Sequence, residues 1–301
     1  MPSTAHRTCS RRWLLGAIAL PALAFAQTAP TLDKVKQSGQ ISVAYRESSI
    51  PFSYLDDKAQ PVGFGYEICM KVVDEVKKAT GRSDLKVNQQ SVTSANRIPL
   101  LVNGTIDIEC GSTTNNAERG KQVACTTNYF YTGTRFLVKT AAAVKSLDDL
   151  KGKPVVSTTG TTNFKIIRNL NEEQKLGIDL LGAKDHAESA LMVQTGRALA
   201  FAMDDILLYG LRASSQNPAE LAVVGEPIQV EPYAIMVRRD DPAFKKLVDD
   251  TLAGLMKSGE FEKLYNKWFQ MPIPPKGINL QVPMSKELRE NLKALSDKPA
   301  T

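Results

Sequence analysis

The sequence predicts an α/β protein built as two lobes with a cleft between them. Short runs rich in β-branched residues alternate with segments of helical periodicity along the whole chain, which is typical of a largely parallel sheet covered by helices. The 301 residues are 43% hydrophobic and 23% charged, and this composition excludes a disordered chain, a collagen-like repeat and a disulfide scaffold. A chain of this length can bury two separate cores of about 130 residues each.

The first unit alternates helix and strand from residue 32 onward. Gly39 and Gly81 follow runs of helical spacing and are typical helix stops, because glycine readily adopts the left-handed conformation that ends many helices. The expected elements are a helix at 32–38, a strand at 41–45, a helix at 66–79, a strand that starts at 85–87, a short helix at 96–102, a strand at 106–109 and an extended exit at 136–139.

The second unit repeats this alternation, and the chain then returns to the first unit. Its expected elements are a strand at 155–157, a helix at 162–170, a strand at 178–181, a helix at 186–195, a strand at 199–203 and a helix at 206–213. An extended run at 233–237 and helices at 244–256 and 260–269 follow, and the proline-rich segment 271–301 is expected to be an irregular tail. The predicted division is a first lobe at 27–136, a second lobe at 137–230, and a return to the first lobe with the tail at 231–301.

The first 26 residues have the three parts of a secretory signal peptide. A basic start precedes an uncharged apolar run from Trp13 to Phe25, and Ala24-Phe25-Ala26 is a small-x-small cleavage site. The apolar run is too short for a transmembrane helix, which needs about 20 residues. Arg11-Arg12 is also compatible with twin-arginine export, and a general-secretion signal is the alternative. We therefore expect an exported protein that is cleaved near Ala26.

Charge and cysteine content restrict the partners. The net charge is +6, and removal of residues 1–26 takes away three arginines and no acidic residue, which leaves +3 without any basic run. Nucleic acid is therefore excluded as a partner. Cys69, Cys110 and Cys125 allow at most one internal bridge, and both a Cys110–Cys125 bridge and three buried thiols are open alternatives. Their spacing matches no metal site, and His186 is the only histidine after the signal segment.

Polar side chains follow the expected strands, where open α/β sheets bind their ligands. The polar residues at these positions include Arg46, Ser94, Arg97, Ser112, Thr114, Arg119, Thr161, Thr162, His186 and Asp204. Taken singly, each has a structural alternative, because Thr161, Thr162 and Asp204 are also suited to cap the helices that follow them, and strand-end arginines often form surface ion pairs. Taken together, the cations outnumber the carboxylates, which suits a small anion that carries one amine.

The chemistry of these groups defines that anion further. An arginine donates two parallel hydrogen bonds to a carboxylate. The helix that opens at Gly160-Thr161-Thr162 offers free N–H groups and the positive end of its dipole to a second anionic group. Asp204 supplies a counter-charge for an ammonium group. An α-amino acid with a second acidic group would engage all of these side chains together.

The same segments resemble the periplasmic substrate-binding proteins of the polar amino-acid ABC transporters (family 3), and especially their glutamate/aspartate-binding members. The resemblance spans nearly the whole chain after the signal segment. It is carried by Arg46–Tyr54, Asn96–Leu101, Asn103–Asp107, Glu109–Asn116 with Glu118 and Arg119, Ala183–His186 and Met203–Asp205. It implies the two-lobed type II periplasmic-binding-protein fold, in which two crossing strands, here expected near 135–139 and 228–233, join the lobes.

The resemblance also implies roles for the candidate residues. Arg119 would hold the α-carboxylate with Thr114 and the helix start at Thr161 and Thr162. Asp204 and the Ser112 carbonyl would hold the α-ammonium group. The side-chain carboxylate would be surrounded by Arg46, Ser94, Arg97 and His186.

The implied function is capture of L-glutamate or L-aspartate in the periplasm and delivery to the membrane subunits of an ABC permease. The protein would act as a monomer, without a cofactor and without chemistry on the ligand. One rival is a dehydratase-like enzyme, since the same fold hosts enzymes, and Glu47 and Glu109 are the nearest general-acid candidates. The other rival is a sensor subunit that reports the ligand to a membrane receptor.

Overall fold

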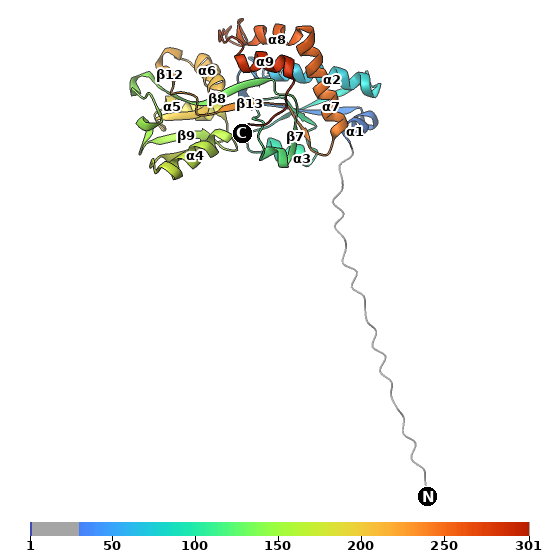
Figure 1. Ribbon diagram of the computed structural model, residues 1–301, viewed down its shortest axis with the longest axis horizontal. Coiled ribbons are helices and arrows are strands. Elements are labelled where there is room, and N and C mark those ends of the chain that lie inside the picture. Colours follow the sequence, from blue (N-terminus) through green and yellow to red (C-terminus); the bar gives the residue numbers. More distant parts are fainter. Residues whose placement is uncertain (2–29, 301) are drawn as a thin grey trace.

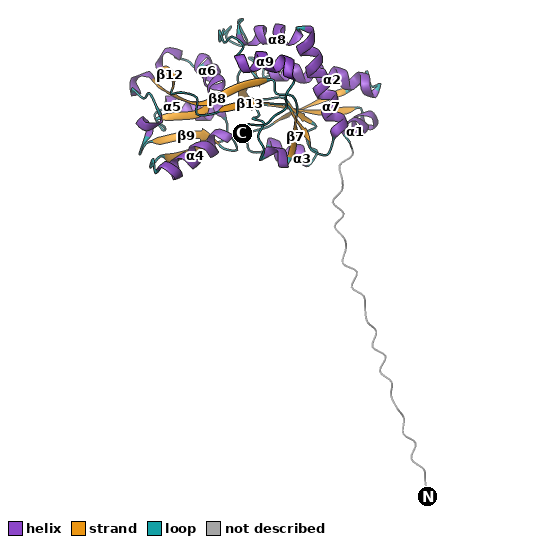
Figure 2. Cartoon of the chain, viewed as in Figure 1, coloured by secondary structure: helices purple, strands orange, loops and turns teal. Residues whose placement is uncertain are grey.

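Two sheets with helices packed against them form two lobes that lie side by side (Figure 1) in the computed structural model, which describes Met1 and residues 30–300. The expected signal peptide lies outside the described residues. Figure 2 shows the strands in the middle of each lobe and the helices around them. Among residues 30–300, no helix combines the length and the hydropathy that crossing a bilayer requires.

The first lobe is built on a five-stranded sheet of order β5-β1-β6-β14-β7. The strands are β1 (Gln40–Tyr45), β5 (Lys86–Ser91), β6 (Ile108–Glu109), β7 (Val123–Cys125) and β14 (Met236–Arg238). β1 is parallel to β5 and β6, whereas β14 is antiparallel to both of its neighbours. The helices of this part of the chain are α1 (Thr31–Ser38), α2 (Phe64–Thr80), α3 (Arg97–Val102), α7 (Pro242–Ser258), α8 (Glu260–Phe269) and α9 (Lys286–Ala294). A small sheet of β2 (Ser48–Ser49), β3 (Ser53–Leu55) and β4 (Pro61–Val62) follows β1.

The second lobe is built on a sheet of order β10-β9-β11-β8-β12. The strands are β8 (Phe130–Lys139), β9 (Pro154–Thr158), β10 (Asp179–Ala183), β11 (Ala200–Asp204) and β12 (Leu221–Val224). The helices are α4 (Thr162–Gln174), α5 (His186–Gln194) and α6 (Asp205–Ser214). Short 3₁₀ turns occur at Arg119–Lys121, Thr140–Ala142, Leu147–Leu150 and Pro218–Glu220. β9, β10 and β11 are mutually parallel, so their carboxyl ends meet at one edge of the sheet.

Two antiparallel strands join the lobes, as expected. β13 (Val230–Tyr233) pairs with the first half of β8, from Val230 opposite Gly133 to Tyr233 opposite Phe130. The segment 228–233 therefore lies where it was expected. The segment 135–139 does not, because it pairs with β11 and β12 inside the second sheet. The strand β8 reaches both lobes because it is ten residues long.

β8 is anchored in both cores. Phe130 at its start lies in an aromatic cluster of the first lobe, with ring centroids 4.9 Å from Phe52 and 5.1 Å from Phe269. Phe136, six residues further on, is buried among the aliphatic side chains of the second lobe, including Val155 and Ile167. Burial at both ends holds the connecting strand firmly in each lobe.

The expected irregular tail contains a helix, so that expectation was wrong in part. α9 is capped by the Ser285 hydroxyl, which accepts a hydrogen bond from the Leu288 amide. Its Asn291 is buried and donates to the backbone carbonyl of Asn128. Leu288, Leu292 and Leu295 recur at helical spacing after the Ser285 cap, so the sequence does carry a local signal for this helix.

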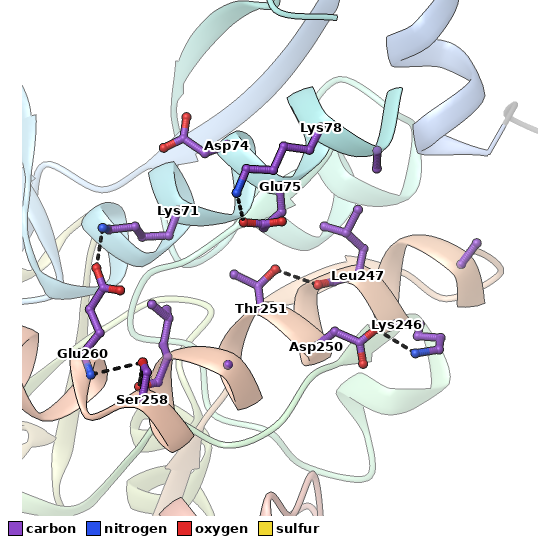
Figure 3. Close-up of a pocket in the computed structure, with 14 residues that line it drawn as sticks. Lys71, Asp74, Glu75, Lys78, Lys246, Leu247, Asp250, Thr251, Ser258 and Glu260 are labelled. Carbon is purple, nitrogen blue, oxygen red and sulfur yellow. Dashed lines mark hydrogen bonds and ion pairs between the residues drawn. The ribbon is translucent and has the colours of Figure 1, made fainter. Parts of the chain in front are cut away.

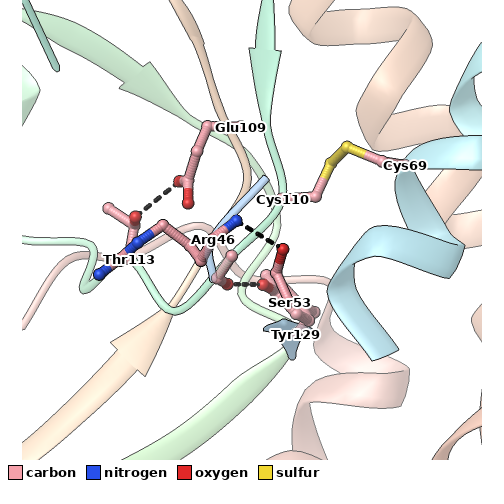
Figure 4. The surroundings of a disulfide bond; sticks show 8 residues. Arg46, Ser53, Cys69, Glu109, Cys110, Thr113 and Tyr129 are labelled. Atoms are coloured by element: carbon pink, nitrogen blue, oxygen red, sulfur yellow. Dashed lines mark hydrogen bonds between the residues drawn. A yellow bond between two sulfur atoms is a disulfide. The ribbon is translucent and has the colours of Figure 1, made fainter. Parts of the chain in front are cut away.

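The disulfide joins Cys69 to Cys110, and not Cys110 to Cys125 (Figure 4). Cys110 directly follows β6 and meets Cys69 of α2 at a Cα–Cα distance of 5.8 Å. Cys125 lies in β7, and β14 from the far end of the chain is inserted between β6 and β7. The alternative of three buried thiols is also wrong, because Cys69 and Cys110 are bridged, and among residues 30–300 Cys125 is the free cysteine.

Candidate functional site

A small cavity between the lobes contains nearly all the residues predicted to bind a ligand. Its volume is ≈ 10 Å³, about what one water molecule needs. The first lobe contributes Ser94, Arg97, Ser112, Thr114 and Arg119, and the second contributes Thr161, Thr162, Asn163, His186, Met203, Asp204 and Leu207. These residues meet here because they follow β5, β6, β9, β10 and β11, whose carboxyl ends face the interlobe space.

Arg46 is the predicted residue that does not line the cavity, and it lies directly behind it. Its Nη2 donates to Ser94 Oγ at 2.9 Å and lies 3.2 Å from His186 Nε2. Burial, followed by repulsion from Arg97, lowers the pKa of Arg46 to about 9. Arg46 therefore connects the first lobe to the start of α5 in the second lobe.

His186 is neutral in this setting. Burial, and then the charges of Arg46 and Arg97, hold its pKa well below the usual value. Because an arginine can only donate, Nε2 accepts from Arg46, and Nδ1 carries the proton and donates to Thr158 Oγ1 at 2.8 Å. The neutral ring thus adds no further charge to this end of the cavity.

Two buried guanidinium groups have unused donors. Arg97 Nη1 donates to the Ser112 carbonyl at 3.3 Å and lies 3.9 Å from Glu109 Oε1. Arg97 Nε and Arg46 Nη1 are buried and make no hydrogen bond within residues 30–300. Glu109 offsets part of this charge from behind (Figure 4), where its Oε2 accepts from Thr113 Oγ1 at 2.6 Å. Buried, unsatisfied cationic donors of this kind are costly unless an anion pairs with them.

Arg119 lies at the mouth of the cavity. Nη1 donates to the Thr114 carbonyl at 2.8 Å, and Nη2 donates across the cleft to the Gly160 carbonyl at 3.3 Å. Burial, and then Arg97, lowers the pKa of Arg119 to about 10. Gly160 has a φ of +78°, and a Cβ there would lie 2.5 Å from Ala95 Cα, so the lobes are in backbone contact at this point.

Of the three residues that were suited to cap a helix, Thr161 does so, whereas Thr162, the first residue of α4, and Asp204 do not. Thr161 does cap α4, since its hydroxyl accepts from the Phe164 amide at 3.1 Å and donates to the Thr158 carbonyl at 2.6 Å. Asp204 makes no capping hydrogen bond to α6. Its carboxylate instead accepts from Asn163 Nδ2 at 2.8 Å and from the Tyr233 hydroxyl at 2.5 Å.

The site also has an acidic part, formed by Asp204 and Glu231, whose charges act on each other and on Arg119. Asp204 is buried, and burial, followed by the charge of Glu231, raises its pKa to about 7. Glu231, Tyr233 and Asn163 were missed by sequence reasoning. Glu231 carried a signal that was available, because it is an acidic residue inside the segment expected to cross between the lobes.

Other parts of the described chain offer weaker candidates. A larger groove lies between α2 and α7 (Figure 3), but its exposed charges already pair: Lys71 with Glu260, Lys78 with Glu75, and Lys246 with Asp250. Glu47 is exposed, and neither it nor Glu109 lines the interlobe cavity. Within residues 30–300, no group of three His, Cys, Asp or Glu side chains is placed to hold a metal ion.

Known proteins are similar to this chain in sequence and in fold. A family model described as bacterial extracellular solute-binding proteins, family 3, matches residues 41–271. The L-glutamate/L-aspartate-binding protein of Pseudomonas aeruginosa is 49% identical over 271 residues, 90% of each chain. The glutamate/aspartate import solute-binding protein of Escherichia coli is 48% identical over 268 residues, 89% of each chain. A mutant of ArgBP from T. maritima has a TM-score of 0.71 at 25% identity, and the match covers 79% of this chain and 98% of that one.

Proposed function

The chain belongs to the family 3 bacterial extracellular solute-binding proteins, and from this we propose that it captures L-glutamate and L-aspartate for import by an ABC transporter. Both relatives described above are named as binding proteins for these two amino acids, and at nearly half identity they cover almost the whole chain. The protein binds its ligand and performs no chemistry on it.

The observation that carries the proposal is the separation of charge within one cavity. Arg97, which has a buried donor without a partner among the described residues, lines the same cavity as Asp204, and Arg46, which has another such donor, lies behind it. An acidic amino acid has one carboxylate for Arg46 and Arg97, a second carboxylate for Arg119, and one ammonium group for Asp204. A neutral or basic amino acid would leave the Arg46 and Arg97 donors unpaired, which costs binding free energy.

The roles that we propose follow this separation. Arg119 binds the α-carboxylate, with Thr114 and the first turn of α4 at Thr161 and Thr162 as further partners. Asp204 and the Ser112 carbonyl accept hydrogen bonds from the α-ammonium group. The side-chain carboxylate is bound by the remaining residues of the basic end, which are Arg46, Ser94, Arg97 and His186.

Two contacts between the lobes support the proposal that the lobes close around the ligand. Arg46 meets His186, and Arg119 meets Gly160, each pair joining one lobe to the other. We propose that the lobes, at 27–136 with 231–301 and at 137–230, rotate about β8 and β13 when the ligand leaves. The closed monomer would deliver the ligand to the permease subunits in the membrane. A signal peptide cleaved near Ala26 would place the mature protein in the periplasm.

Calorimetric titration of the mature, ligand-stripped protein tests the proposal. The ligands are glutamate, aspartate, their amides, and glutarate, the five-carbon dicarboxylate that lacks the amine. We expect tight binding of glutamate or aspartate and much weaker binding of the amides and of glutarate. Equal affinity for glutamine would contradict the role of the arginine end, and no binding of any of these ligands would contradict the function.

A further inference from the structure

Glu231 is a buried carboxylate on a connecting strand, and it contacts residues of both lobes. It lies on β13, opposite Thr132 of β8, and is 0% exposed. Its Oε2 accepts hydrogen bonds from Thr114 Oγ1 and from Thr162 Oγ1, each at 2.6 Å. Thr114 follows β6 in the first lobe, and Thr162 is the first residue of α4 in the second. A single carboxylate oxygen therefore joins a hydroxyl group from each lobe.

The distances determine where the two hydroxyl protons point. A threonine hydroxyl has one proton and two lone pairs. The oxygens of Thr114 and Thr162 lie 3.3 Å from each other but only 2.6 Å from Glu231, and 2.6 Å is typical of a charge-assisted bond from a hydroxyl to a carboxylate. Both protons are thus directed to Glu231, so both oxygens can only accept a hydrogen bond from any further partner.

Both threonines line the cavity together with Asp204. Asp204 is close enough to Glu231 to feel its charge, because burial and then that charge raise the pKa of Asp204. This part of the cavity consequently offers oxygen acceptors and negative charge, while Arg46 and Arg97 can only donate. An ammonium group satisfies such acceptors, whereas a carboxylate placed there would be repelled.

We propose that Glu231 is a positioning residue that selects ligands carrying an amine, by directing the Thr114 and Thr162 protons away from the cavity. This inference rests on the proposed function and refines it. The two threonine hydroxyls face the ammonium group, so any help that these residues give to the α-carboxylate comes from the backbone. Removal of Glu231 frees both protons to turn into the cavity and withdraws a negative charge from beside the ammonium group.

The test compares glutamate with glutarate on the same proteins by calorimetry, with titrations extended to millimolar glutarate. In Glu231→Gln, which preserves shape and removes the charge, we expect the preference for glutamate over glutarate to fall about tenfold, as loss of support for a charged hydrogen bond predicts. In Glu231→Leu, which also removes the acceptor, we expect a larger fall. Glu109→Gln is the matched control, because Glu109 is also a buried carboxylate that accepts a hydrogen bond from a threonine, but it lies near Arg97. This variant should change the affinities for glutamate and glutarate by the same factor and so leave the preference between them unchanged.

A merely structural role would weaken glutamate and glutarate binding equally. An unchanged preference in Glu231→Gln therefore overturns the inference, while glutamate binding by the wild type leaves the proposed function intact. If thermal melting shows that Glu231→Leu does not fold, Glu231→Gln decides alone. Failure of the wild type to bind glutamate and aspartate would overturn the proposed function, and the inference with it.

Discussion

The carbonyl oxygen of Ile50 in the first lobe lies 2.5 Å from the position that a Cβ on Gly210 of the second lobe would occupy. Gly210 is in the interior of α6, where glycine costs about 1 kcal/mol relative to alanine. Its φ is not in the left-handed region, so the conformation of the helix does not require glycine. Glycine is required because the two lobes approach each other too closely at this point for a Cβ.

Gly210→Ala is therefore expected to weaken glutamate binding while it stabilises the ligand-free protein. The added methyl group meets the Ile50 backbone only when the lobes are closed, and overpacking of this kind costs about 1–3 kcal/mol. We expect roughly tenfold weaker binding by calorimetry and a higher Tm without ligand. Gly254→Ala in α7, where a Cβ meets nothing within 4 Å, should raise the Tm and leave the affinity unchanged. Equal affinities in the two variants would contradict closure at Gly210.

Arg97→Leu should remove most of the affinity for acidic ligands. The substitution removes one of the two buried guanidinium groups that pair with the ligand's side-chain carboxylate, and loss of such a charge partner typically costs about 2–5 kcal/mol. Glutamine should lose much less, so the selectivity between glutamate and glutamine measured by calorimetry should collapse. Arg82→Leu is the control, because Arg82 forms a partly exposed ion pair with Asp84 far from the cavity. Retention of glutamate selectivity in Arg97→Leu would rule out the proposed acidic-ligand end.

Glutamate binding should tighten as the pH rises toward 7. The pKa of Asp204 is raised to about 7 in the ligand-free protein, and an ammonium ligand favours the ionised carboxylate, so binding below this pH must release a proton. Titrations in buffers of different ionisation enthalpy should detect that proton. Asp204→Asn should weaken all α-amino acids alike and abolish the proton release. A pH-independent affinity in the wild type would contradict this assignment.

Asp204 makes folding stability depend on pH in the opposite direction to ligand binding. Because the folded-state pKa of Asp204 lies above its usual value of 3.8, the folded state binds the proton more tightly than the unfolded state does. The contribution of Asp204 is therefore most favourable near pH 4 and is lost as the pH rises toward 7. The difference in unfolding free energy between the wild type and Asp204→Asn should change in this direction over the same range, as measured by denaturant unfolding.

Loss of the Cys69–Cys110 bridge should destabilise the protein far more than it weakens ligand binding. The bridge closes a loop with a sequence separation of 41, for which chain entropy predicts about 4 kcal/mol. Denaturant unfolding of the double variant Cys69→Ser/Cys110→Ser measures this loss. Cys125→Ser should unfold like the wild type, and the oxidised mature protein should present one reactive thiol after unfolding. Two or more thiols under oxidising conditions would contradict the bridge.

The site was largely predictable because its residues follow strands, and strand ends can be located from local patterns. Arg97, Arg119, His186 and Asp204 were all identified in this way, and the structure brings them to one cavity. Their assembly needs only the rule that parallel strands present their carboxyl ends at one edge of the sheet. The alternation of strands and helices that predicts the two lobes is local in the same sense.

Relationships between distant segments were decided only by the tertiary structure. The sequence left a Cys110–Cys125 bridge and three buried thiols as open alternatives, but β14, which lies more than 100 residues further on, is inserted between the strands that carry Cys110 and Cys125. Capping by Asp204 was a reasonable local alternative until Tyr233, from a connecting strand, proved to be its partner. Periodicity and capping patterns depend on residues within a few positions of each other. Strand order, burial of Glu231 and contact between the lobes depend on how those elements pack, and a single sequence does not encode that packing in any local pattern.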